Sequence, residues 1–378
     1  MKKIKIKELG KIISGGTPST ANENFWDGEL IWITPKDLSK NKSKYIFNGE
    51  RNITQDGLEH SSAKLLPVNS VLLSSRAPIG YLAIAGCELT TNQGFKSIIC
   101  DESIVLPEYL YYSLSTKIAD LISISYGSTF LELSKSSFEN FELSIHSIQE
   151  QQHIVDTIGS IDDLIENLNK QNSQLNKLIS KLFIKYTKNI DKIKIGECSG
   201  YSIIKSGINY FDSTKIYLDT ASVDDDNIIS KDYIITINEK PSRANMQPIP
   251  NSVWFAKLKD SPKYIHVTSY MNDLLTNYIF STGFMGLKCD NEYISNYFYA
   301  LITSEDFINQ KNALSIGATM QGINNESFKE ILVPSLSINQ MNEFGLTIYN
   351  YIHSIYTNKI KIEQLSNLKK KYLSKFFD

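Results

Sequence analysis

The sequence contains little of several residue types that mark common protein classes. Only three of its 378 residues are arginine, and Asp plus Glu (41) slightly exceed Lys plus Arg (39), for a net charge of −2. A chain with this balance does not hold nucleic acid by bulk charge, so any such binding needs local basic surfaces. No apolar run reaches the roughly 18 residues of a membrane helix, and no apolar signal-type segment follows the basic N-terminus. A cytoplasmic protein without membrane contact is therefore expected.

Residues that hold metals, disulfides or cofactors are also sparse. The four cysteines form no C-x-x-C pair, and the five histidines lack ligand spacing, so neither a structural zinc site nor a disulfide framework is indicated. Phosphate-binding glycine loops, dinucleotide fingerprints and H-E-x-x-H are missing. So is the Asn/Asp-Pro-Pro-Tyr/Phe segment expected of an amino-methyltransferase. The sequence predicts a binding protein that is not an enzyme, with no cofactor and no metal.

What the sequence does contain is a long internal repeat. The segment YGSTFLELSKSSF (126–138) returns as IGATMQGINNESF (316–328), at an offset of 190 residues, and NQGFKSIICDE further upstream resembles STGFMGLKCDN. Solenoid repeats have units of roughly 20 to 50 residues, so a period this long excludes them. It indicates that a whole globular unit was duplicated, and the chain length agrees with two domains.

Each copy of the repeat is followed by a heptad pattern. Apolar residues recur in alternating steps of four and three over 154–186, interrupted by Asn172, and again over 344–376, interrupted by Asn358. Such patterns predict two long helices that need a partner, each on the order of 50 Å long at 1.5 Å per residue. Lys369 also falls on the second seam, where its side chain is expected to reach out to solvent.

The two asparagines predict how the helices pair. A parallel arrangement would place each Asn against an aliphatic side chain. In an antiparallel arrangement whose paired residue numbers sum to about 530, Asn172 meets Asn358. A buried Asn pair of this kind specifies register and orientation at some cost in stability. The other interpretation is that both asparagines lie at the solvent edge of looser packing.

These patterns divide the chain into four segments: a globular head over 1–150, a helix over 151–190, a second head over 191–337 and a second helix over 338–378. Short β-like runs such as ELIWITP and SVWFAKL, separated by turn residues and a few helical patterns, predict a mixed head in each case. The predicted fold class is α+β. It comprises two similar mixed α/β domains separated by two long helices, which form an antiparallel coiled coil with pseudo-twofold symmetry.

The sequence resembles the specificity (S) subunits of Type I restriction-modification systems along its whole length. The motifs that carry the resemblance in the first half are SGGTPST (14–20), LIWITPKDL (30–38), SSRAPIG (74–80), TTNQG (90–94), YGSTFLELS and IQEQQHI. Those in the second half are KPSRANMQP (240–248), WFAKLKDSPK (254–263) and IGATMQGIN. The second head lacks the Gly-Gly-Thr-Pro start of the first.

The resemblance implies a function and a set of partners. Each head would be a target recognition domain that reads one half of a bipartite site in double-stranded DNA, and the helices would set the spacing between the halves. Two adenine methyltransferase (M) subunits would dock on the helices, and translocase-nuclease (R) subunits would join them. This chain would supply the sequence recognition, while methylation and cleavage would belong to the partners.

The side chains expected to contact DNA lie in loops of small residues. Arg76 and Arg243 stand out because arginine is so scarce and both lie close to proline; the alternative for each is a surface ion pair or a loop-bracing bond. Base edges are read by Arg, Lys, Asn, Gln and hydroxyls, whereas phosphate contacts only position the protein. The expected contacts are Lys36, Ser74, Ser75 and Arg76 in the first head, and Lys240, Ser242, Arg243, Asn245, Lys257, Lys259 and Lys263 in the second.

Other features have structural interpretations. Trp32 and Trp254 are expected in the core, and the acidic run 224–226 is expected to form a solvated loop. The repeated elements 127–129 and 317–319 occupy the same place in two heads of different specificity, which favours backbone support or phosphate contact over base reading.

The residues by themselves are compatible with two other functions. A coiled-coil adaptor that presents two protein-binding heads would have the same charge balance, but would show no salt-dependent affinity for DNA. An enzyme would need an acid/base or nucleophile cluster of His, Asp and Ser, and the sequence presents none.

Overall fold

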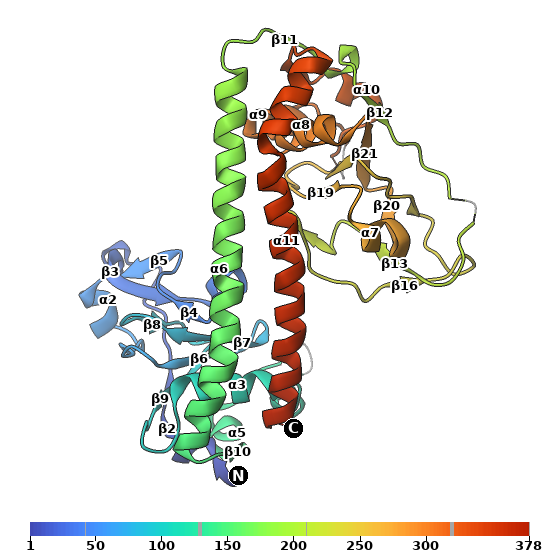
Figure 1. Cartoon of the computed structure of the whole chain (residues 1–378). Helices are drawn as coiled ribbons and strands as arrows, with labels where there is room; N and C mark the ends of the chain where they lie inside the picture. Colours follow the sequence, from blue (N-terminus) through green and yellow to red (C-terminus); the bar gives the residue numbers. More distant parts are fainter. Residues whose placement is uncertain (42, 128–130, 209, 318–320, 378) are drawn as a thin grey trace. The chain divides into compact units, whose positions relative to one another are not determined.

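The computed structural model describes residues 1–41, 43–127, 131–208, 210–317 and 321–377 (Figure 1). The chain forms two compact units: unit 1 contains Met1–Asn169 and Ile360–Asp378, and unit 2 contains Lys170–Lys359. Each of the two long helices, α6 (Ile148–Thr187) and α11 (Ile338–Phe377), therefore contributes residues to both units. Among the helices within the described ranges, none combines the length and apolar character that crossing a membrane requires.

Unit 1 is a mixed α/β domain with its core between sheet and helix. The five-stranded sheet has the order β2-β9-β6-β7-β4, a three-stranded sheet has the order β5-β3-β8, and β1 pairs with β10. The strands are β1 (Lys2–Lys5), β2 (Gly10–Ser14), β3 (Trp26–Ile33), β4 (Tyr45–Ile46), β5 (Arg51–Ile53), β6 (Val71–Ser75), β7 (Ile79–Ala85), β8 (Thr90–Thr91), β9 (Lys96–Cys100) and β10 (Glu142–Ile145). The helices are η1 (Ile6–Glu8), η2 (Glu23–Phe25), α1 (Pro35–Lys40), α2 (Gln55–Glu59), α3 (Pro107–Thr116), α4 (Ile118–Ser123) and α5 (Lys135–Asn140).

Unit 2 has the same kind of architecture. Its two four-stranded sheets have the orders β12-β21-β18-β19 and β16-β13-β20-β17, and β11 pairs with β22 and β14 with β15. The strands are β11 (Lys192–Lys194), β12 (Tyr201–Ile203), β13 (Lys215–Leu218), β14 (Val223–Asp224), β15 (Asn227–Ile228), β16 (Ile234–Ile235), β17 (Ala244–Met246), β18 (Ser252–Ala256), β19 (Tyr264–Val267), β20 (Tyr278–Ser281), β21 (Phe284–Cys289) and β22 (Leu332–Pro334). The helices are η3 (Ile195–Glu197), α7 (Asn272–Asn277), α8 (Glu292–Ile302), α9 (Glu305–Ala313) and α10 (Asn325–Lys329).

The repeat seen in the sequence is a repeat of structure. In unit 1 helix α3 packs on β6 and β7, and in unit 2 helix α8 packs on β18 and β21. The short helices α5 and α10 begin with equivalent caps, because the side chains of Ser134 and Asn324 each accept a hydrogen bond from the backbone N–H three residues later. Trp32 and Trp254 are both buried, as predicted, and their indole N–H groups donate to the Gly16 carbonyl and to Ser252 Oγ.

Local sequence determines where both long helices begin. Ser147 and Glu150 form a capping box, since the carboxylate accepts from the Ser147 backbone N–H at 3.0 Å while Ser147 Oγ accepts from the Glu150 N–H. Ser337 and Gln340 form the same arrangement at the start of α11. Each box satisfies two helix N–H groups that have no partner within the helix.

The antiparallel register predicted from the asparagines is confirmed within each unit. In unit 2, Asn358 Nδ2 donates to Asn172 Oδ1 at 2.9 Å, and the two residues are 8% and 7% exposed. The rings of Tyr186 and Phe344 also lie 5.2 Å apart in unit 2. The alternative in which both asparagines lie at a solvent edge is wrong.

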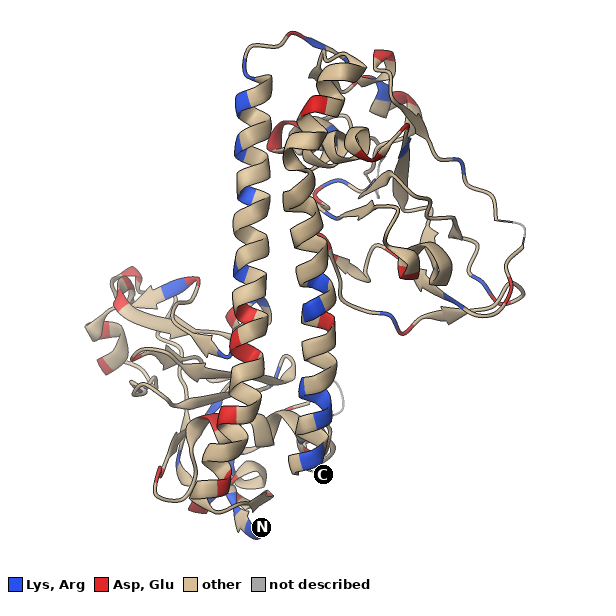
Figure 2. Ribbon diagram, viewed as in Figure 1, with Lys and Arg blue, Asp and Glu red and all other residues tan. Residues whose placement is uncertain are grey.

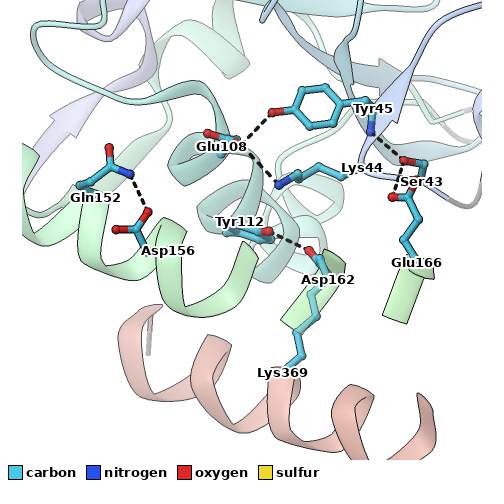
Figure 3. Close-up of polar contacts among 10 residues, drawn as sticks. All are labelled: Ser43, Lys44, Tyr45, Glu108, Tyr112, Gln152, Asp156, Asp162, Glu166 and Lys369. Atoms are coloured by element: carbon cyan, nitrogen blue, oxygen red, sulfur yellow. Dashed lines mark hydrogen bonds and ion pairs between the residues drawn. The ribbon is translucent and has the colours of Figure 1, made fainter. Parts of the chain in front are cut away.

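Unit 1 repeats this register through a charged contact that links three helices (Figure 3). Asp162 of α6 accepts a hydrogen bond from the Tyr112 hydroxyl of α3 at 2.7 Å and pairs with Lys369 Nζ of α11 at 2.6 Å. The loop before β4 also reaches α6, because Ser43 Oγ donates to Glu166 at 3.0 Å. The prediction that Lys369 extends into solvent is wrong, because its ammonium finds a carboxylate on the facing helix.

A second lysine of α11 corrects another prediction. The prediction that the acidic run 224–226 is solvated fails at Asp226: Lys359 Nζ lies 2.6 Å from Asp226 Oδ2, and the Asp226 side chain is only 10% exposed. Asp224 and Asp225 are exposed, and desolvation raises the pKa of Asp225 while a hydrogen bond with Tyr264 opposes that shift. Asp226 attaches a loop of the second domain to the helix within unit 2.

We expect the single substitution Asn358→Leu to lower the free energy of unfolding by about 1–3 kcal/mol, because it leaves a buried amide of Asn172 without its partner. The double substitution of both asparagines by Leu should restore most of the loss, since two apolar side chains then meet. Urea-induced unfolding followed by circular dichroism measures both effects. A single variant as stable as the wild type would contradict the buried pair.

We expect Asp162→Ala to lower the free energy of unfolding by about 1–3 kcal/mol, because the buried hydroxyl of Tyr112 loses its acceptor and Lys369 loses its counter-ion. The adjacent and exposed Asp163 provides a matched control on the same helix. Its replacement by Ala should change stability by less than about 0.5 kcal/mol. Equal losses in the two variants, measured by thermal unfolding, would refute a specific role for Asp162.

Candidate nucleic-acid interface

Both domains contain the same tight turn in front of an equivalent strand. In unit 1 it consists of residues 92–94, where the Gly94 N–H donates to Asn92 Oδ1 at 2.9 Å just before β9. In unit 2 it consists of residues 281–283, where the Gly283 N–H donates to Ser281 Oγ at 3.1 Å just before β21. We call these segments the first and second glycine turns. The sequence repeat of NQGF and STGF thus marks one backbone structure built twice.

Four of the sequence motifs meet at the first glycine turn. The Gly94 carbonyl accepts from the Ser75 N–H at 2.7 Å, and a side chain built on Gly94 would touch Pro35, the neighbour of Lys36, and the stem of Arg76. The hydroxyl of Thr17 donates to the side chain of Gln93. The loops that carry Lys36, Arg76 and Thr17 therefore converge, although they are far apart in the sequence.

Steric constraints explain why SGGTPST has two consecutive glycines. A Cβ on Gly15 would lie 2.1 Å from the Asn92 carbonyl oxygen, and one on Gly16 would lie 2.2 Å from the Ala63 backbone nitrogen. Real Cβ atoms do not approach backbone atoms so closely. The N-terminal segment can therefore lie against the first glycine turn at Gly15, and against residues 62–63 at Gly16, only because both positions lack a side chain.

The second glycine turn is bordered by cations from two other loops, the one before β17 and the one between β18 and β19. The Arg243 carbonyl accepts from the Thr282 N–H, and the Lys257 N–H donates to the Gly283 carbonyl, both at 2.9 Å. Thr220 also lies beside Gly283, and its carbonyl accepts from Lys263 Nζ at 2.7 Å. Partial burial, followed by the charge of Arg243, lowers the pKa of Lys257. The second domain thus concentrates positive charge where the first domain places Lys36 and Arg76.

Two of the predicted contact residues need correction. Ser74 and Ser75 are fully buried, so their hydroxyls do not face solvent. Ser74 Oγ accepts from the Tyr81 N–H and donates to the Pro78 carbonyl, both at 2.8 Å, while Ser75 Oγ lies 3.4 Å from the buried ammonium of Lys96. The two serines brace the loop that presents Arg76. We therefore remove them from the proposed contact set.

The remaining first-domain candidates are accessible but already paired. Lys36 is exposed and lies 2.8 Å from Glu50, which raises the lysine pKa. The Arg76 guanidinium is partly exposed and lies 3.7 Å from Glu132. Exposed ion pairs of this kind stabilise a fold by little, so exchanging the carboxylate for a phosphate costs little.

The second-domain candidates separate into bracing and exposed residues. Lys240 Nζ donates to the Ala244 carbonyl at 3.0 Å and holds its own loop, whereas Asn245 Oδ1 accepts from the Ile208 N–H at 2.8 Å and joins that loop to the segment before β13. Ser242, Arg243 and Lys259 are exposed. Lys257 lines an open surface hollow of about 560 Å³, together with Ile316, Gly322, Ile323, Asn324, Asn325 and Glu326.

Sequence reasoning missed the buried cations beneath these loops. Lys96 of β9 lies under Ser75 and Arg76, and burial lowers its pKa while Glu132 opposes the shift. Gln93 was also missed, although its place in the repeated NQGF segment was a usable signal. Residues Ser128 and Thr129 of the first repeated element, and Ala318 and Thr319 of the second, lie outside the described residues.

Charged side chains of both signs are distributed over the described parts of both units (Figure 2). Lys and Arg lie on strands, loops and both long helices, and on α6 the acidic residues precede the basic ones along the helix (Figure 2). Within the described ranges, no three His, Cys, Asp or Glu side chains are placed to hold a metal ion. The local cationic surfaces at the two glycine turns are therefore the strongest candidate sites.

Comparison with known proteins shows a sequence similarity over the first part of the chain and a shared fold over the whole of it. Residues 1–177 match the family model described as Type I restriction modification DNA specificity domain. The crystal structure of the Type I restriction-modification S subunit from M. genitalium aligns with 100% of this chain and 96% of that chain, with a TM-score of 0.57 and 16% identity. Residues 1–177 are thus similar to a Type I restriction modification DNA specificity domain, and the whole chain shares the fold of that S subunit.

Two curated relatives are similar to one part of the chain. The MjaIX specificity subunit of Methanocaldococcus jannaschii is 48% identical over 181 residues, which is 47% of this chain and 42% of that protein. The EcoR124I/EcoR124II specificity subunit of Escherichia coli is 29% identical over 168 residues, which is 43% of this chain and 41% of that protein. Each alignment thus spans less than half of the relative's length.

Proposed function

We propose that this chain is the DNA-recognition subunit of a Type I restriction-modification complex and that each domain reads one half of a bipartite site in double-stranded DNA. The observation that carries the proposal is the pair of equivalent glycine turns, each bordered by cations on loops of different sequence. A common backbone with different side chains is what two readers of different half-sites require. The chain itself is not an enzyme in this proposal.

The cations divide into two roles. Flexible and exposed lysines such as Lys36 and Lys259 would contact phosphates, which fix the position of the domain without reading sequence. The planar guanidinium groups of Arg76 and Arg243 can donate two hydrogen bonds to one guanine, so they are the proposed base-reading groups. The buried Lys96 and the serines beneath Arg76 would hold that arginine in position.

The long helices would set the distance between the half-sites. Each has 40 residues, which corresponds to about 60 Å at 1.5 Å per residue. In other DNA-binding proteins the geometry of a dimer determines half-site spacing in the same way. Two adenine methyltransferase subunits docked on the helices, with translocase-nuclease subunits joining them in the cytoplasm, would complete the proposed assembly.

We expect co-expression with its cognate adenine methyltransferase to produce one bipartite methyladenine motif with a constant gap in host DNA. Single-molecule sequencing of that DNA, with and without this chain, is the measurement. The motif should vanish when the chain is deleted, because the methyltransferase then lacks its DNA-reading subunit. A stable complex with the methyltransferase but no dependent motif would overturn the proposal and favour the protein-binding adaptor.

We expect Arg76→Ala to relax recognition of one half-site only and Arg243→Ala to relax recognition of the other. Loss of a bidentate contact should reduce discrimination at one base pair by about 1–3 kcal/mol. Methylation rates on duplexes altered in one half-site at a time measure the effect. Lys192→Ala, which removes an exposed lysine paired with Asp306, is the control and should change neither half. Loss at both half-sites from either arginine variant would contradict separate reading.

A further inference from the structure

The loops beside the two glycine turns have equivalent positions but different braces. Ser75 and Lys257 correspond, because each donates its N–H to the glycine of its turn and each accepts at its carbonyl from a following segment, Leu133 or Ile323. Ser74 therefore corresponds to Ala256. In the first domain the Ser74 hydroxyl holds the loop, whereas Ala256 has no side-chain group that could do so.

The second domain holds its loop from another helix. Lys311 of α9 is 2% exposed, and its Nζ donates to the carbonyls of Ala256, Leu258 and Ser261 at 3.3, 2.9 and 3.1 Å. An ammonium has three donors and no acceptor, so three converging carbonyl groups satisfy it completely. These carbonyls come from the loop that carries Lys257 and Lys259.

Asn312, the residue after Lys311, also binds this loop. Asn312 Oδ1 accepts from the Asp260 N–H at 3.1 Å, and Asn312 Nδ2 donates to Asp260 Oδ1 at 3.1 Å. The Lys259 N–H donates to the Gln321 carbonyl at 2.9 Å. Loop 257–261 is therefore held at successive residues, with Lys311 at its centre.

A buried ammonium is a costly way to fill this space. Lysine is almost never fully buried unless it is paired, and a buried charge must recover its lost hydration. Burial lowers the pKa of Lys311 to about 8, while the carboxylate of Asp260 opposes that shift, so the side chain carries its proton at neutral pH. At the equivalent position of the first domain, 190 residues earlier, the side chain is the buried Leu121. The apolar residue serves for packing there, so the cation has a task specific to the second domain.

We propose that Lys311 is a positioning residue that fixes loop 257–261 and thereby places Lys257 and Lys259 for contact with the second half-site. This inference rests on the proposed function, because it takes the second glycine turn as a DNA-reading surface. Lys311 itself does not touch DNA in this view. Its three hydrogen bonds instead set the direction in which the partly buried Lys257 and the exposed Lys259 leave the loop.

The test uses the full chain in complex with its adenine methyltransferase. Lys311→Met keeps the volume and removes the three donors, and we expect discrimination at the second half-site to fall at least about tenfold while the first half-site is read normally. The second half-site is the one whose recognition Arg243→Ala relaxes. Leu121→Met makes the matching change at the equivalent position of the first domain and should affect neither half.

A double-mutant cycle separates positioning from general destabilisation. If Lys311 acts through the loop, Lys257→Ala should cost much less in the Lys311→Met background than in the wild type. A general loss of stability would instead weaken both half-sites, and the two substitutions would then add. Additive effects, or unchanged reading of the second half-site, would overturn the inference.

A second variant keeps the inference testable if Lys311→Met does not assemble. Asn312 is half-exposed, and Asn312→Ala removes the two bonds to Asp260 while Lys311 remains. We expect a smaller loss confined to the second half-site, and equal loss at both half-sites would contradict the inference. Failure of the proposed function is distinguishable, because the wild type would then show no motif-dependent methylation.

Discussion

The pairing of α6 with α11 at one register is the constraint on which the rest of the structure depends. In unit 2 the side chains of Asn172 and Asn358 form a hydrogen bond with each other. In unit 1 Asp162 pairs with Lys369, and the two residue numbers again sum to about 530. A slip of one heptad would leave buried amides and charges without partners. The free-energy cost of that slip is far larger than it would be for a seam made of apolar residues alone. Because each helix contributes to both units, this register is imposed on each of them.

The heads show how one duplicated backbone accepts two sets of side chains. The glycine turns, the helices after them and the caps of α5 and α10 repeat, because they rest on backbone hydrogen bonds and close approaches. The loops beside the turns differ in their cations and in the way they are held, by a serine hydroxyl in one domain and by a buried ammonium in the other. Such a separation allows the reading surface to change while the scaffold stays fixed.

The scarcity of arginine drew attention to two loops beside the glycine turns, but it did not indicate which neighbouring polar residues are exposed there. Arg76 and Arg243 do lie beside the glycine turns, since the motifs that contain them are loops that end near these turns. The neighbouring serines of Arg76 are buried, Lys240 binds its own loop, and Asn245 binds the backbone of Ile208. A polar residue next to a functional one in sequence often supports it, because successive residues of a strand or turn point to different sides.

The sequence by itself determined the duplication, the two long helices and their antiparallel register. All of these follow from the repeat, from heptad periodicity and from the need to pair two asparagines. Only the tertiary structure decided which polar residues are exposed, that Lys359 and Lys369 bind carboxylates, and that Lys96 and Lys311 are buried under the candidate loops. The physical reason is that these contacts join residues 21 to 207 positions apart, and no local pattern records which distant polar group a lysine will meet.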